Sequence, residues 1–165
     1  MTKSQMLALV RKLIADEQAT GFTEGGNLEE PEGTQELLNY LDRAVDEYSK
    51  RQASNADIRL VNKITLDSNE EILPDDFISF CGLIPAKIED KKLYYYGDIV
   101  DPTVKYFARL PYVSSYSDTA TLPYEQDQYM TIAALAAIYA LNKHEFNVSQ
   151  DLMLLGIGGQ NGNPQ

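Results

Sequence analysis

The segment of residues 103–137 constrains the fold of this chain more than any other part of the sequence. Apolar residues alternate with mostly polar ones over residues 103–110, which is the period of a β-strand, and Pro111 ends the alternation. After a polar loop, Leu122 and Pro123 lead into acids suited to a helix N-terminus. Almost every residue of the stretch that follows is apolar, so we expect a helix buried on most sides.

The remaining sequence shows two amphipathic stripes at helical spacing, then a β-rich middle, then the helix just described. We expect helices over residues 4–19, 34–53, 124–143 and 148–155, with the strands inside residues 58–110. The sequence therefore predicts a mainly helical α+β fold. In this fold a small antiparallel β-sheet is inserted between the second and third helices of a bundle of three to four helices.

The length of 165 residues favours a single domain, which we place at residues 1–155. Residues 156–165 are rich in glycine and asparagine and predict a flexible C-terminal tail. The N-terminus has no compact apolar stretch of the signal-peptide type. No apolar run is long enough to cross a membrane, so we expect no membrane association.

The charge balance limits the partners of this chain. The net charge is −11, with only 14 basic residues, which argues against binding to a nucleic-acid backbone. Ten acidic residues and one basic residue, Arg43, lie between Asp16 and Glu47. This stretch fits either a solvated face or a surface that repels DNA as DNA moves past it, and both can hold.

Residues with catalytic or metal-binding chemistry are few. The single histidine, His144, lies at an expected helix end, and the single cysteine, Cys81, lies in an apolar stretch typical of a core. One histidine and one cysteine cannot form a zinc site without several carboxylates. We therefore expect no enzyme activity, no cofactor and no metal. Paired carboxylates leave a hydrolase as a remaining alternative.

Eleven tyrosines are the main interaction signal. Tyrosine is enriched at protein interfaces because it combines apolar area with a polar tip. Tyr94 and Tyr95 are consecutive, so in a strand at least one faces away from the core. We expect inter-subunit or tail contacts at Tyr94, Tyr95, Tyr96, Tyr112 and Tyr116.

Four sequence patterns carry a resemblance to a known family. They are Leu73-Pro74-Asp75-Asp76-Phe77, the Lys105–Pro111 stretch, Leu122-Pro123 before an alanine-rich helix, and Asn39-Tyr40-Leu41-Asp42-Arg43-Ala44. Together they resemble the head-to-tail adaptor proteins of tailed bacteriophages, also called connector or head completion proteins.

That resemblance implies a structural virion protein made in the host cytoplasm and located in the neck of the particle. It implies a ring of twelve copies beneath the portal protein, with tail or nozzle proteins docked below. Double-stranded DNA would pass through the central channel without specific binding during packaging, retention and ejection of the genome. Contacts within such a ring are head-to-tail, because closed rings need heterologous interfaces.

The resemblance also implies positions for two sets of residues. Portal docking would fall to the C-terminal segment, at Leu152, Leu154, Leu155 and Ile157. Acids facing the channel would be Glu24, Glu29, Glu30 and Glu32. The main alternative is an acidic interaction protein, either a DNA mimic or a regulator of a DNA-binding protein, which rests on the acids between Asp16 and Glu47.

Overall fold

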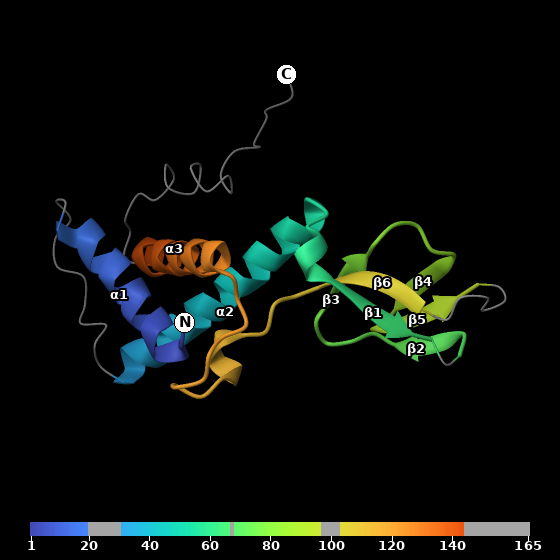
Figure 1. Ribbon diagram of the computed structural model, residues 1–165, viewed down its shortest axis with the longest axis horizontal. Helices are drawn as coiled ribbons and strands as arrows, with labels where there is room; N and C mark the ends of the chain where they lie inside the picture. Colours follow the sequence, from blue (N-terminus) through green and yellow to red (C-terminus); the bar gives the residue numbers. More distant parts are fainter. Residues whose placement is uncertain (20–30, 67, 97–102, 144–165) are drawn as a thin grey trace, which may run out of the picture. The chain divides into compact units, whose positions relative to one another are not determined.

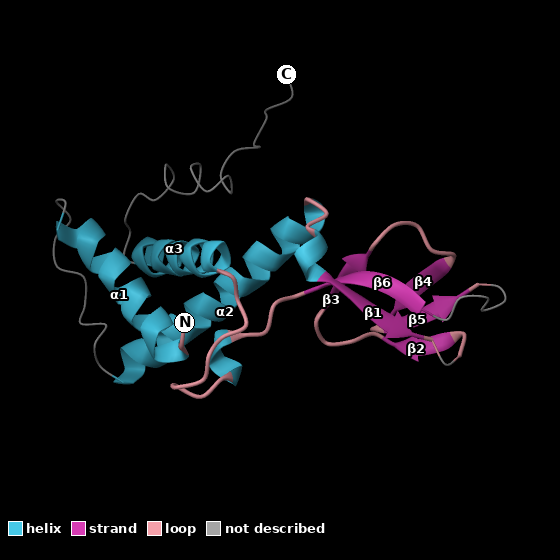
Figure 2. Ribbon diagram, viewed as in Figure 1, coloured by secondary structure: helices cyan, strands magenta, loops and turns pink. Residues whose placement is uncertain are grey.

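The computed structural model describes residues 1–19, 31–66, 68–96 and 103–143 (Figure 1). The chain divides into two compact units. Unit 1 consists of Met1–Val45 and Tyr112–Gln165, and unit 2 consists of Asp46–Pro111. Figure 2 shows that the helices and the strands occupy separate stretches of the chain.

Unit 1 is built from helices. It contains α1 (Lys3–Ala19), the first part of α2 (Pro31–Ser54), the 3₁₀ helix η2 (Val113–Ser115) and α3 (Gln126–Lys143). Helix α1 packs against α3, and Met6 and Val10 of α1 are fully buried one turn apart. The Arg11 guanidinium of α1 donates a hydrogen bond to Thr34 Oγ1 of α2 at 2.7 Å. The Arg43 guanidinium of α2 lies 4.2 Å from the centre of the Tyr139 ring of α3.

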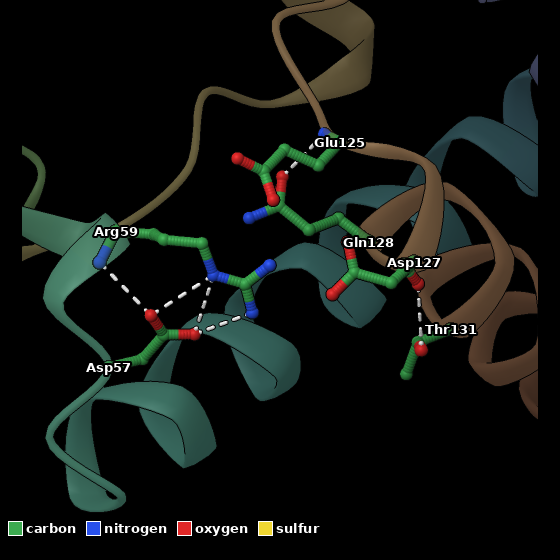
Figure 3. Close-up of polar contacts among 6 residues, drawn as sticks. All are labelled: Asp57, Arg59, Glu125, Asp127, Gln128 and Thr131. Carbon is green, nitrogen blue, oxygen red and sulfur yellow. Dashed lines mark hydrogen bonds and ion pairs between the residues drawn. The ribbon is translucent and has the colours of Figure 1, made fainter.

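Helix α3 is buried on most sides, as its apolar sequence predicts. Between Ile132 and Leu141 every residue except Ala134 and Tyr139 is buried. The helix begins with a half capping box: Glu125 N–H donates to Oε1 of the buried Gln128 at 2.8 Å (Figure 3). This side-chain acceptor satisfies a backbone donor that a helix N-terminus otherwise leaves unpaired.

Unit 2 begins with the end of α2, which stops in a Schellman motif. Asp57 N–H donates to Gln52 O at 2.9 Å, and Ala56 N–H donates to Ala53 O at 3.0 Å. Ala56 adopts a φ of 57°, the left-handed conformation that glycine favours. The 3₁₀ helix η1 (Ile58–Leu60) follows, and the Asp57 carboxylate caps it by accepting from the backbone N–H of Arg59 (Figure 3).

The six strands of unit 2 form two antiparallel sheets. They are β1 (Val61–Thr65), β2 (Glu70–Ile72), β3 (Phe77–Phe80), β4 (Ala86–Glu89), β5 (Lys92–Tyr95) and β6 (Thr103–Ala108). One sheet has the order β1-β6-β3 and the other the order β2-β5-β4. A two-residue turn at Asp90 and Lys91, both with positive φ, joins β4 to β5.

Two apolar clusters hold unit 2 together. The larger one combines residues from both sheets, with Leu93 and Val104 buried among partly buried neighbours such as Phe77 and Tyr95. The smaller one joins the end of α2 to the first sheet through Ala53, Leu60 and Phe107. Burial of such side chains stabilises each by about 1.5–3 kcal/mol relative to exposure.

The expected fold class is wrong. A mainly helical fold with one small sheet was expected, but the described residues hold three α-helices and two three-stranded sheets placed between α2 and α3. The error arises at residues 78–88, which the apolar pattern predicts as strand. Gly82, with a φ of 103°, and Pro85 interrupt this stretch, and its two halves, β3 and β4, pair in different sheets.

Several predicted features fall outside the described residues: the fourth helix at residues 148–155, the domain end at residue 155 and the tail at residues 156–165. Among the helices that the structure describes, none is both long and apolar enough to cross a membrane.

Candidate interaction surface

The β2-β5-β4 sheet presents two faces of different chemistry. Residues directly opposite one another in antiparallel strands share a face, so the register defines rows across the sheet. One row is Glu71, Leu93 and Ile88, and it lies on the face that packs into the apolar cluster. The opposite face carries the rows Glu70–Tyr94–Lys87 and Ile72–Lys92–Glu89. We call this second face the outer face of the β2-β5-β4 sheet.

The outer face carries charged side chains in pairs. Lys92 Nζ lies 2.6 Å from Glu70 Oε1, and Lys87 Nζ lies 2.8 Å from Glu89 Oε2. Hydrogen bonding between Lys87 and Glu89 raises the pKa of the lysine and lowers the pKa of the glutamate. The hydrogen bond to Glu70 raises the pKa of Lys92 in the same way. All these pairs are solvent-exposed, so they contribute little to stability and leave the face polar.

The tyrosines of β5 alternate as a strand requires. Tyr94 lies on the outer face, with Lys87 Nζ 5.0 Å from the centre of its ring. Tyr95 packs against the apolar cluster on the other face. Tyr96, at the end of the strand, is 57% exposed. Tyr94 and Tyr95 are thus half-buried on opposite faces of the sheet, and only Tyr96 of these three predicted contact residues is largely accessible.

The other two predicted contact tyrosines lie in unit 1. Tyr112 and Tyr116 flank η2 and are half-buried. The carbonyl oxygen of Tyr112 accepts from Ser115 Oγ at 2.6 Å, and that of Tyr116 accepts from Lys3 Nζ at 3.0 Å. The five tyrosines are thus divided between the two units and do not form one cluster within either of them.

The remaining predicted site residues are not placed by the structure. Leu152, Leu154, Leu155, Ile157, Glu24, Glu29 and Glu30 lie outside the described residues. Glu32 falls within the bounds of α2, but its side chain is not among those described. Portal docking and the channel-facing acids therefore stay predictions.

Exposed aliphatic side chains are a feature of unit 2 that sequence reasoning missed. Of the seven large hydrophobic residues exposed in the described part of the chain, five lie in unit 2: Ile58, Ile72, Leu83, Ile88 and Tyr96. Ile72 and Ile88 are on β2 and β4, the two edge strands of the β2-β5-β4 sheet. The alternation of residues around Ile72 and Ile88 was visible in the sequence, but which strands lie at an edge was not.

Buried polar groups in unit 2 have structural partners. Tyr106 is 2% exposed, and its hydroxyl donates to Asp76 Oδ1 at 3.1 Å. Burial, with the nearby Asp76 carboxylate, raises the pKa of Tyr106 to about 12. Burial also raises the pKa of the Cys81 thiol, so this cysteine is protonated at neutral pH.

Charged groups elsewhere follow the same pattern of local pairing. Arg59 holds the pKa of Asp57 below its usual range through a side-chain hydrogen bond (Figure 3).

Within residues 1–19, 31–66, 68–96 and 103–143, no three His, Cys, Asp or Glu side chains gather closely enough to hold a metal ion. His144 lies outside these residues.

In comparisons with known proteins, no family model, no curated protein and no solved structure matches this chain.

Proposed function

We propose that this chain is a head-to-tail adaptor of a tailed bacteriophage, a structural protein that joins the portal to the tail in the neck of the virion. The resemblance of four sequence patterns to such adaptors carries the proposal, and the surface of unit 2, where exposed isoleucine and tyrosine lie among paired lysines and glutamates, supports it. Aromatic and apolar residues surrounded by polar ones are typical of protein–protein contacts. A chain with this surface is suited to assembly with other proteins.

The sequence resemblance supports the same function. One of its strongest parts, the Lys105–Pro111 stretch, includes the end of β6, the central strand of the β1-β6-β3 sheet. A second part, Leu122-Pro123, ends two residues before Glu125, the cap of α3. The expected partners are the portal protein, tail or nozzle proteins and further copies of this chain in a ring of twelve.

The net charge of −11 fits a channel protein that does not bind DNA. A ring of such chains repels the phosphate backbone wherever acids face the channel. No reaction and no cofactor form part of the proposed function, and DNA passes through the ring without specific binding.

Native mass spectrometry of the purified protein, alone and mixed with the portal ring from the same genome, tests this proposal. We expect twelve copies bound per portal ring. A portal ring from an unrelated phage is the matched control and should bind none. A stable monomer or dimer in both samples would overturn the proposal and favour the acidic interaction protein.

The same assay tests the C-terminal segment. A variant lacking residues 156–165 removes Ile157 and should bind fewer copies per portal ring, because part of the expected docking segment is lost. The substitution Met130→Ser, at an exposed apolar residue of α3, serves as the control and should leave the number of bound copies unchanged.

A further inference from the structure

The β2-β5-β4 sheet has two different edges. Strand β5 is central, and β2 and β4 each pair with it on one side only within the described residues. Each edge strand carries an exposed isoleucine: Ile72 of β2 is 69% exposed and Ile88 of β4 is 49% exposed. Edge strands of monomeric proteins usually avoid exposed apolar residues, because an open edge can pair with another chain.

The backbone N–H and C=O groups of both isoleucines point away from β5, towards the open edges of the sheet. On the β2 side, Leu73 N–H donates to Lys91 O at 2.9 Å and Tyr95 N–H donates to Asn69 O at 2.8 Å. Bonding residues alternate along an antiparallel strand, so Ile72, next to Leu73, directs its N–H and C=O outward. On the β4 side, Tyr96 N–H donates to Pro85 O at 2.7 Å, and the same alternation directs the backbone of Ile88 outward.

The two edges carry opposite charges in the same row. Glu70 of β2 and Lys87 of β4 are the two ends of the row that crosses the outer face through Tyr94. If the sheet of one copy continues in register into the sheet of another, Lys87 of the first copy comes to lie beside Glu70 of the second. Opposite charges on neighbouring strands favour that register.

We propose that the β4 edge of one copy of this chain pairs with the β2 edge of the next copy. Since β2 and β4 both run antiparallel to β5, the new pair is parallel. With this pairing, each copy has both of its edge strands covered, including Ile72 and Ile88. Two β4 edges paired with each other would leave the β2 edge, and Ile72 with it, exposed to solvent. The contact joins two different surfaces, so it propagates from copy to copy.

The closed ring in which we place this contact rests on the proposed function. The edge strands have only three and four residues. A single contact of this size is weak, so we expect association that depends on protein concentration and that a portal ring strengthens by aligning neighbouring copies.

Edge-blocking variants test the pairing. Ile72→Pro and Ile88→Pro each block one edge, and neither removes a hydrogen bond inside the sheet, because both N–H groups point outward. In sedimentation velocity we expect the wild-type chain to self-associate and each variant alone to remain monomeric. An equal mixture of the two should form dimers and nothing larger, since only one β4 edge and one β2 edge remain intact. Leu83→Ser, at an exposed apolar residue outside both edges, should assemble like the wild type.

Reversing the charges of Lys87 and Glu70 provides a second test that does not depend on proline. Lys87→Glu and Glu70→Lys should each weaken self-association, because like charges then meet across the contact. The double variant should recover it. Far-ultraviolet circular dichroism identifies any variant that fails to fold.

The outcomes separate this inference from the proposed function. Edge variants that self-associate and occupy the portal ring as the wild type does would overturn the inference and leave the adaptor function standing. Dimers of Ile72→Pro alone would overturn it in favour of pairing between two β4 edges. A wild-type chain that self-associates by these edges but does not bind the portal would support the inference and overturn the adaptor function. A wild-type chain that stays monomeric with and without the portal would overturn both.

Discussion

Ser49 is a buried polar residue that ties α2 to the chain leaving β6. Its hydroxyl is fully buried and accepts a hydrogen bond from Leu110 N–H at 3.1 Å. Ser49→Ala leaves this N–H without its acceptor, and we expect a loss of about 1–3 kcal/mol in the free energy of unfolding, measured by urea denaturation. Ser54→Ala, on the exposed side of the same helix, controls for the change in helix propensity. Equal effects of the two substitutions would contradict this account of Ser49.

Tyr106 makes the stability of unit 2 sensitive to alkaline pH. Its pKa is about 12 in the folded chain, above the ordinary value of 10.0. A raised pKa means that the contribution of Tyr106 to the free energy of unfolding is complete below pH 10. This contribution is lost as the pH rises towards 12. We expect about 2–3 kcal/mol of unfolding free energy to disappear across this window, and the loss to be smaller in Tyr106→Phe.

Spectrophotometric titration of tyrosinate checks the same property. Tyr106 should ionise at a higher pH than an ordinary tyrosine in the wild type, and its late step should be missing from the titration of Tyr106→Phe. Titration of all tyrosines together near pH 10 in the folded protein would be incompatible with a buried Tyr106.

At the scale of elements, the C-terminus of α2 is strained at Ala56. This residue holds the left-handed position of the Schellman motif, with a φ of 57°. Glycine adopts this conformation without the steric cost that a Cβ brings. We expect Ala56→Gly to raise the melting temperature, with a gain of about 0.5–1 kcal/mol, and Ala56→Val to lower it. A destabilised glycine variant would show that Ala56 is not strained.

The elements differ in how far local sequence predicts them. The second helix, expected over residues 34–53, is observed as Pro31–Ser54, because its apolar stripe and its C-terminal turn are local signals. The strand pattern expected from residue 58 begins three residues later, since Asp57 caps a 3₁₀ turn first. The local sequence also predicts a hairpin turn at Glu89-Asp90-Lys91, and β4 and β5 form this hairpin.

Pairing between distant strands was beyond local prediction. Alternation shows which residues share a face, and it correctly separates Tyr94 from Tyr95. It does not show that β6 is the centre of one sheet and β5 the centre of another, because register depends on contacts far apart in sequence. The exposed edges at Ile72 and Ile88 could therefore be found only once the strand order was known.

At the scale of the whole molecule, charge is divided unevenly between the two units. Unit 1 contains thirteen acidic and five basic residues, a net charge of −8, and unit 2 contains twelve acidic and nine basic residues, a net charge of −3. Like charges within a compact body repel one another and lower its stability. Unit 1 should therefore carry most of the electrostatic cost of folding this acidic chain.

Hydrogen exchange at low and high salt measures this difference, because it reports on each unit separately. Raising the salt shortens the screening length from about 30 Å at 0.01 M to about 3 Å at 1 M, which weakens repulsion among exposed acids. We expect amide exchange to slow more in α1 and α3 of unit 1 than in β1 and β6 of unit 2. Sucrose is the control, since it stabilises compact states through exclusion from the protein surface and should slow exchange in both units alike. Equal effects of salt on the two units would mean that local ion pairs, rather than net charge, determine the electrostatic stability of the molecule.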